Sequence, residues 1–168
     1  KAAAVLSEVG EVDVIWDDSG SILSEDELST IITKYDAAVV WIDPLRGKAM
    51  NAAKNKLKVI GVPRAGFDNV DVEAATQSGI PVIYSPGMNS AAVSDFTFGL
   101  ILGLCRGIVS SNMLLKTDNW KGRWAMFPGS NLEGKILGII GLGNIGSRVA
   151  MKARAFGMKV IACDPYVT

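Results

Sequence analysis

The stretch from Lys135 to Asp164 constrains the fold more than any other part of the chain. It begins with a short isoleucine-rich run at 136–140, whose length and composition predict a buried parallel strand. A glycine-rich turn follows, and apolar residues at helical spacing then predict a helix that ends at Gly157. A second apolar run at 158–163 predicts another strand, with Asp164 at its end. This order predicts a parallel β-α-β unit.

The glycine-rich turn, GLGNIG at 141–146, has the chemistry of a dinucleotide site. We expect Gly141 to permit the tight turn, Gly143 to let a pyrophosphate approach the backbone, and Gly146 to let the helix pack close to the strand. The helix N-terminus offers free N–H groups and partial positive charge to the phosphates. Asp164 stands where an acid accepts hydrogen bonds from a ribose and repels a 2′-phosphate, which favours NAD. An ordinary glycine-rich turn is the alternative, but the flanking strands and helix favour NAD.

Composition narrows the classes of partner. The chain of 168 residues is 49% hydrophobic, and its 17 basic and 17 acidic residues cancel, so we expect no nucleic-acid partner. The longest apolar stretch, 98–105, is too short to cross a bilayer, so we expect no membrane partner. Cys105 and Cys163 lie in apolar runs without metal or redox spacing, which predicts buried free thiols, no metal site and a cytoplasmic protein. The chain contains no histidine.

Helices and strands are predicted to alternate before residue 86. Ser24 and Glu27 form a capping box that predicts a helix through Thr33. Apolar runs predict strands at 12–16, 37–42, 57–61 and 80–84, with short helices at 48–54 and 72–78. This alternation predicts a parallel sheet with crossover helices. The chain therefore divides into a small α/β domain at 1–88 and, at 89–168, a linking helix followed by half of a nucleotide-binding domain.

A long helix is predicted from 90 to 116, and because it is apolar on nearly all sides we expect it to be buried. Gly99, Gly103 and Gly107 recur every fourth residue, and each costs about 1 kcal/mol in a helix relative to alanine. Close approach of another helix would compensate, and glycines simply tolerated by a well-packed helix are the alternative. In the loop at 117–134, aromatic residues are expected to anchor the loop rather than stack on a ligand: Trp120, Trp124 and Phe127.

Taken together, these residues resemble the D-isomer-specific 2-hydroxyacid dehydrogenase family, which includes phosphoglycerate dehydrogenase. The resemblance is densest at 57–71, at 89–93 and from 132 to 166. It implies an α/β protein with a flavodoxin-like substrate domain, here without its first strand, and the first half of a Rossmann-like NAD-binding domain. It also implies an NAD-dependent oxidoreductase that acts on small D-2-hydroxyacids or 2-keto acids in the cleft between these domains. The long helix resembles part of the family's homodimer interface.

The resemblance also implies roles for individual residues. The expected cofactor-binding residues are Gly141, Gly143, Asn144, Ile145, Gly146 and Asp164. The expected substrate-binding residues are Arg64, Ala65 and Gly66, in a loop that runs to Phe67 and binds the carboxylate through backbone N–H groups, and Asn89 at the domain junction. The family more often has glycine at Arg64, and at Ala65 some members have a threonine hydroxyl. Arg64 either binds the substrate carboxylate or phosphate, or is a salt-bridged or solvated cation at the rim of the cleft.

No catalytic residue is expected within this chain. The family's catalytic arginine, glutamate and histidine come later than Thr168, so we interpret the chain as an internal fragment of a dehydrogenase roughly twice its length. Alone it should not transfer hydride, because it has no histidine to act as the base. The alternative is a nucleotide-sensing interaction protein like the C-terminal-binding-protein corepressors, which share turns similar to 66–69 and 164–166. We favour the enzyme.

Overall fold

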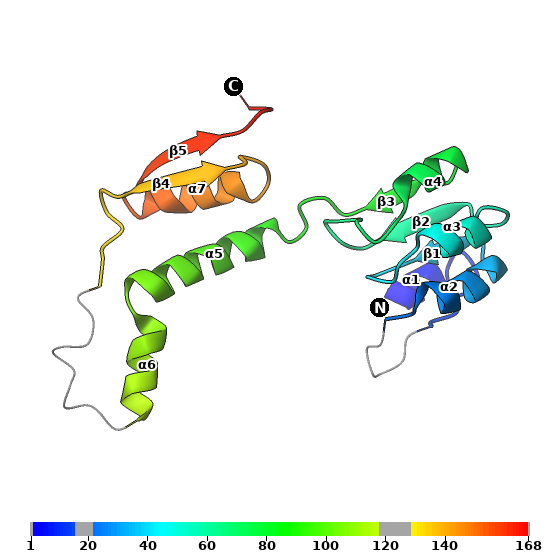
Figure 1. The fold of residues 1–168 in the computed structure, drawn as a ribbon, viewed down its shortest axis with the longest axis horizontal. Coiled ribbons are helices and arrows are strands. Elements are labelled where there is room, and N and C mark those ends of the chain that lie inside the picture. The colour runs from blue at the N-terminus through cyan, green and yellow to red at the C-terminus, as the bar shows by residue number, and fades with distance from the viewer. Residues whose placement is uncertain (1, 16–21, 118–128, 168) are drawn as a thin grey trace. The chain divides into compact units, whose positions relative to one another are not determined.

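The computed structural model describes residues 2–15, 22–117 and 129–167, which form two compact units, Lys1–Pro86 and Gly87–Thr168 (Figure 1). The division lies close to the predicted boundary after residue 88. Both units combine helices with parallel strands, which confirms the predicted α/β class. The predicted aromatic anchors Trp120, Trp124 and Phe127 lie outside the described residues.

The first unit is built on a three-stranded parallel sheet. Its strands lie in the order β1-β2-β3: β1 Ala37–Val39, β2 Val59–Val62 and β3 Val82–Tyr84. Ala38 is in register with Ile60, and Ile60 with Val82. The strand predicted at 12–16 is wrong over its described part, because residues 12–15 belong to no strand. A strand needs a hydrogen-bonded neighbour, and none of the described residues pairs with this segment.

The first unit also contains short helices. They are α1 Ala2–Leu6, α2 Glu25–Ile31, the 3₁₀ turn η1 Ile32–Lys34, α3 Gly47–Ala53 and α4 Val72–Gln77. Of these, α2, η1, α3 and α4 contribute residues to the core, whereas residues 3–6 of α1 are exposed. The buried core joins helix and strand residues, among them Leu28, Leu45, Met50, Ile60 and Val62. Asp71 caps α4 as predicted, since its carboxylate accepts the Ala74 N–H at 2.9 Å. Gly79 follows that helix with φ 68°, as expected of a glycine that stops a helix.

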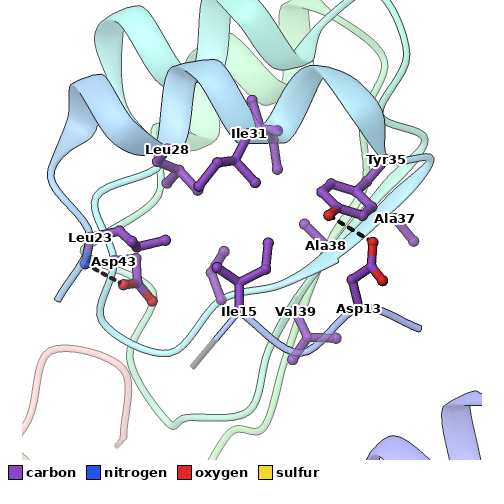
Figure 2. Close-up of a pocket in the computed structure, with 12 residues that line it drawn as sticks. Asp13, Ile15, Leu23, Leu28, Ile31, Tyr35, Ala37, Ala38, Val39 and Asp43 are labelled. Carbon is purple, nitrogen blue, oxygen red and sulfur yellow. Dashed lines mark hydrogen bonds between the residues drawn. The ribbon is translucent and has the colours of Figure 1, made fainter. Parts of the chain in front are cut away.

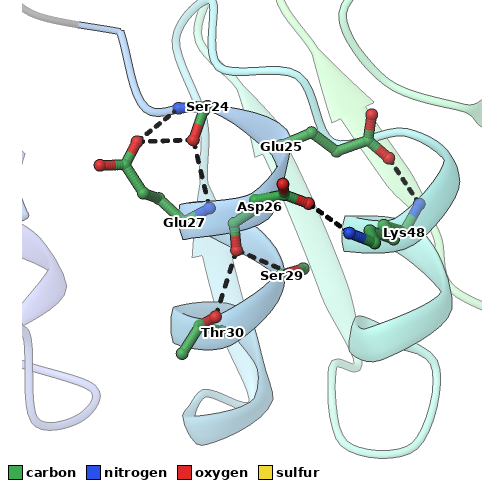
Figure 3. A network of polar contacts seen from close by, with 7 residues as sticks. All are labelled: Ser24, Glu25, Asp26, Glu27, Ser29, Thr30 and Lys48. Carbon is green, nitrogen blue, oxygen red and sulfur yellow. Dashed lines mark hydrogen bonds and ion pairs between the residues drawn. The ribbon is translucent and has the colours of Figure 1, made fainter.

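The predicted capping box is confirmed at the start of α2 (Figure 3). The Glu27 N–H donates to Ser24 Oγ at 3.3 Å, and the Ser24 N–H donates to Glu27 Oε2 at 2.9 Å. The two acids between them reach the first turn of α3. Glu25 accepts the Lys48 N–H at 2.5 Å, and Asp26 pairs with Lys48 Nζ at 2.6 Å. This exposed ion pair adds little stability, so its effect is mainly to align the starts of the two helices.

The second unit contains the predicted β-α-β motif. Its elements are α5 Ser90–Cys105, α6 Ile108–Lys116, β4 Ile136–Ile140, α7 Gly146–Ala155 and β5 Lys159–Cys163. β4 and β5 are parallel, and α7 covers one face of the pair (Figure 1). Val149 and Ala153 are the buried residues of α7, and Phe98 of α5 packs in the same core. The helix face that was predicted from spacing therefore faces the sheet.

The predicted continuous helix from 90 to 116 is wrong. The chain breaks at Gly107, whose φ of 59° is left-handed, and α5 and α6 meet at a bend of 61°. Gly107 is therefore required by a change of direction and does not continue a stripe with Gly99 and Gly103. Among the described residues, no single helix is long and apolar enough to span a membrane, although α5 and α6 would pass that test as a bent pair.

The predicted burial of this helix is also wrong. Only Ser90, Ser94 and Phe98 are buried in α5, and Leu104 is 85% exposed. The physical reason is that, within the described part of the chain, α5 packs mainly against α7 and so is covered along one side. Phe98 stacks on Phe156 at 5.2 Å between ring centroids. Lys152 of α7 also donates to Ser94 Oγ at 2.6 Å, which links the two helices.

The prediction of two buried thiols is wrong for Cys163, which is exposed, while Cys105 is half-buried. Cys163 is in register with Ile140, which is 97% exposed. Both side chains lie on the face of the β4–β5 pair away from the α7 core, and none of the described residues covers it. An apolar strand predicts burial on two faces, whereas this two-stranded sheet is covered on one.

Candidate functional site

Two of the three glycines in the loop after β4 are required by the backbone itself. Gly141 has φ 91°, a conformation that residues with side chains rarely adopt. A Cβ atom added at Gly146 would lie 2.0 Å from the Gly141 carbonyl oxygen, so only hydrogen fits there. This contact lets α7 begin immediately beside the end of β4, as the spacing of the motif predicted.

Gly143 is different, because nothing in the chain demands glycine there. Its φ lies outside the left-handed region, and no atom lies within 4 Å of an added Cβ. The loop therefore leaves open space next to its backbone at this position. A pyrophosphate approaching the main chain would use that space, so the local geometry fits the cofactor that the motif predicted.

The start of α7 faces the same loop. Ile145 is its N-cap and makes no side-chain capping bond, so the first N–H groups of this ten-residue helix have no side-chain acceptor. The Ser147 N–H and hydroxyl both donate to the Gly143 carbonyl, at 3.0 and 2.7 Å. Ser147 thus holds the loop carbonyl, while the N–H groups of Gly146 and Arg148 have no acceptor among the described residues and remain available to an anion.

Asp164 contacts the glycine loop directly. Its Oδ2 accepts the Leu142 N–H at 2.6 Å, and its Oδ1 accepts the Tyr166 N–H at 2.8 Å. The Tyr166 N–H chiefly, and then the Leu142 N–H, hold the pKa of the Asp164 carboxyl below its ordinary value. An ionised carboxylate therefore lies at the edge of the loop, which fits the prediction that Asp164 binds the ribose. The bond to Leu142 was not anticipated from the sequence.

Asn144 lies against the turn that precedes α5. A Cβ added at Gly87, where φ is 73°, would lie 3.0 Å from Asn144 Nδ2. Asn89, in the same turn, is the N-cap of α5 and is exposed; its side chain makes no capping bond, while its carbonyl accepts the Val93 N–H at 2.9 Å. The structure thus brings Asn144 to the turn that contains Asn89, a proximity that sequence reasoning missed.

Arg64 follows β2 in the first unit, and its guanidinium is held by neighbours from the same unit. Nη1 donates to the Trp41 carbonyl at 3.0 Å, Nη2 lies 3.6 Å from an Asp68 carboxylate oxygen, and the group stacks 5.9 Å from the centre of the Trp41 ring. Its side chain is 25% exposed. The salt-bridge contacts of the second interpretation are therefore present, and part of the side chain remains accessible.

The loop after Arg64 offers backbone donors. Within the described residues, the N–H groups of Ala65 and Gly66 have no hydrogen-bond acceptor, and both residues are partly exposed. Phe67 packs edge-on against Tyr84, with 4.8 Å between the ring centroids. Asn69 is buried and donates to the Asp43 carbonyl at 3.1 Å, which fastens the far end of the loop. These contacts fit a loop that presents free N–H groups to an anion from a braced position.

A separate cavity of about 150 Å³ lies beside β1 (Figure 2). Most of the residues that line it have apolar side chains, and they come mainly from α2, β1 and the segment before α2. Its two carboxylates are already engaged, since Asp13 accepts the Tyr35 hydroxyl at 2.9 Å and Asp43 accepts the Leu23 N–H at 3.0 Å. The bond to Asp13 raises the pKa of Tyr35, so the phenol stays neutral. None of the predicted site residues lines this cavity, and it has no arrangement for acid–base chemistry.

In the part of the chain that the structure describes, no group of three or more histidine, cysteine, aspartate or glutamate side chains is placed to bind a metal.

Comparison with known proteins supports the family resemblance that the sequence motifs indicated. The family model for the D-isomer specific 2-hydroxyacid dehydrogenase catalytic domain matches residues 1–163. The chain is 41% identical over 166 residues to D-3-phosphoglycerate dehydrogenase of Methanocaldococcus jannaschii, covering 99% of this chain. It is 41% identical over 144 residues to hydroxypyruvate reductase of Thermotoga maritima, covering 85%.

Solved structures of dehydrogenases have a fold similar to that of this chain. D-lactate dehydrogenase from Aquifex aeolicus, complexed with NAD and lactic acid, matches 98% of this chain with a TM-score of 0.81 and 30% identity. The chain covers only part of each relative: 30% of the Methanocaldococcus protein, 46% of the Thermotoga protein and 47% of the Aquifex chain.

Proposed function

Because the chain belongs to the D-isomer-specific 2-hydroxyacid dehydrogenase family, we propose that the full-length protein is an NAD-dependent oxidoreductase. Its substrates are small D-2-hydroxyacids, which it oxidises at C2, and the corresponding 2-keto acids, which it reduces, as phosphoglycerate dehydrogenase does. NAD supplies the hydride chemistry, and the protein binds and orients the reactants. The base that takes the hydroxyl proton and the cation that polarises the C2 oxygen are assigned to the full-length protein outside this chain, which contains no histidine.

The observation that carries the cofactor assignment is the open space at Gly143, next to the uncapped start of α7. We assign Gly141, Gly143, Asn144, Ile145 and Gly146 to the pyrophosphate. We assign Asp164 to the ribose, since its charge disfavours the 2′-phosphate of NADP. The second unit accordingly contains the nucleotide-binding residues, and the first unit contains the loop assigned to the substrate.

The substrate assignment rests on the loop after β2. The N–H groups of Ala65 and Gly66 suit a carboxylate, and the accessible flank of Arg64 can add a charged contact. Asn89 is assigned to the same role because it is exposed and its side chain makes no capping bond.

We further propose that the full-length protein is a cytoplasmic homodimer and that α5 takes part in its interface. Phe96, Leu100 and Leu104 recur every fourth residue and are all exposed, with Leu100 at 58% and Leu104 at 85%. No atom lies within 4 Å of a Cβ added at Gly99 or Gly103, so a second helix could approach closely there. An apolar stripe of this kind is typical of an association surface.

The test is turnover by the full-length protein. NADH absorbance is followed with glyoxylate, pyruvate and hydroxypyruvate, and we expect oxidation with at least one of them. Gly143→Val should abolish it by filling the space beside the loop, whereas the matched control Gly10→Val, also at an open position, should keep it. NADH binding without turnover of any 2-keto acid would instead favour the nucleotide-sensing interaction protein.

A further inference from the structure

The glycine loop is fastened to the end of β5 by two hydrogen bonds. The Gly141 N–H donates to the Cys163 carbonyl at 2.8 Å, and the Leu142 N–H donates to Asp164 Oδ2 at 2.6 Å. The first is a main-chain bond that any residue at 163 would provide. The second depends on a carboxylate side chain, and it is short, as bonds to charged acceptors are.

The orientation of this carboxylate is itself determined by the chain. Its other oxygen, Oδ1, accepts the Tyr166 N–H at 2.8 Å, so both oxygens are held by backbone donors on either side of it. A loop with three glycines has unusual conformational freedom, and ordering it when a ligand binds would cost free energy. A fixed acceptor at Leu142 removes part of that freedom before the ligand arrives.

We propose that Asp164 is a positioning residue for the phosphate loop, in addition to any contact with the ribose. Its carboxylate holds Leu142, which keeps the backbone from Gly143 to the start of α7 arranged for a pyrophosphate. This inference rests on the proposed function, because it assumes that the loop binds a dinucleotide. It assigns to one side chain two separable tasks: recognising the sugar and ordering the loop.

Inorganic pyrophosphate separates these tasks because it has no ribose. If Asp164 only recognises the sugar, removing its negative charge from the neighbourhood of an anion strengthens pyrophosphate binding. If Asp164 orders the loop, removing it weakens pyrophosphate binding despite the loss of repulsion. The two roles therefore predict opposite signs for the same measurement.

The experiment compares Asp164→Ala and Asp164→Asn in the full-length protein. Glu133→Gln is the matched control, since it removes a carboxylate charge from the opposite end of β4. Exchange of the Leu142 amide is measured without nucleotide, and pyrophosphate binding is measured by calorimetry. We expect Asp164→Ala to raise Leu142 exchange about tenfold or more, as loss of a charge-assisted bond implies, and to weaken pyrophosphate binding. Asp164→Asn retains an oxygen for Leu142 and should show smaller changes, and Glu133→Gln none.

Unchanged Leu142 exchange in Asp164→Ala, or tighter pyrophosphate binding by that variant, would overturn the positioning role. A wild-type protein that binds neither NAD nor pyrophosphate would refute the proposed function. In that case faster Leu142 exchange in Asp164→Ala would still support the ordering of the loop by Asp164, and unchanged exchange would overturn that role as well.

Discussion

Replacing Gly146 with alanine should destabilise the second unit, although alanine is the better helix former. The added Cβ would lie 2.0 Å from the Gly141 carbonyl oxygen, whereas non-bonded atoms prefer a separation of about 3.5 Å. The obstacle is backbone, so no side chain can rotate away. Either the loop or α7 must therefore move by more than about 1 Å, and backbone shifts forced by overpacking typically cost about 1–3 kcal/mol. Gaining a better helix former returns at most about 1 kcal/mol.

The assay is thermal unfolding of the full-length protein, with amide exchange of β4 and α7 as the local measure. We expect the melting temperature of Gly146→Ala to fall by about 2–4 °C for each net kcal/mol lost. Gly143→Ala is the matched variant, because an added Cβ there meets nothing within 4 Å. It should change stability by less than about 0.5 kcal/mol, yet weaken NAD binding. Wild-type stability of Gly146→Ala, or equal destabilisation by both variants, would refute this reasoning.

Four other outcomes are expected. Backbone N–H groups lower the pKa of the Asp164 carboxyl from 3.8, so the glycine loop should be fully ordered above pH 3.8 and should lose order as the pH falls through the lowered pKa. Amide exchange of the loop measures this order, and Asp164→Asn should make it independent of pH. Gly103→Leu should dissociate the proposed dimer in sedimentation experiments, and a variant that stays dimeric contradicts the α5 interface. Arg64→Ala should raise KM for the 2-keto acid by roughly tenfold if the guanidinium binds the carboxylate, and leave it unchanged if the ion pair with Asp68 is its only role. The isolated chain of 168 residues should not oxidise NADH with any 2-keto acid, because it has no histidine; turnover at about 1 per second would show that another group serves as base.

Local chemistry made much of the structure predictable. The capping box at Ser24 and the cap at Asp71 involve residues three positions apart, so their hydrogen bonds follow from the chain's own geometry. The bounds of β4 were predicted without error, because the apolar run at 136–140 is followed directly by Gly141, whose positive φ begins the turn. The cofactor motif and the family resemblance depend on the same short-range pattern.

Elements whose extent depends on neighbours were predicted less well. The segment at 12–15 has the composition of a strand, but a strand exists only where another pairs with it. The apolar pattern of α5 and α6 suited both a straight buried helix and two exposed ones. The spacing of the three glycines did not predict that Gly107 would adopt a left-handed φ and separate α5 from α6.

The sequence by itself therefore determined the α/β class, the β-α-β unit and the glycine loop, since each is encoded by residues close together in the chain. Only the tertiary structure decided which residues distant in the sequence form hydrogen bonds with one another. The bond from Leu142 to Asp164 joins residues 22 apart, and the bond from Lys152 to Ser94 joins residues 58 apart. Periodicity carries no information about such pairs, because they form only when packing brings separate elements together.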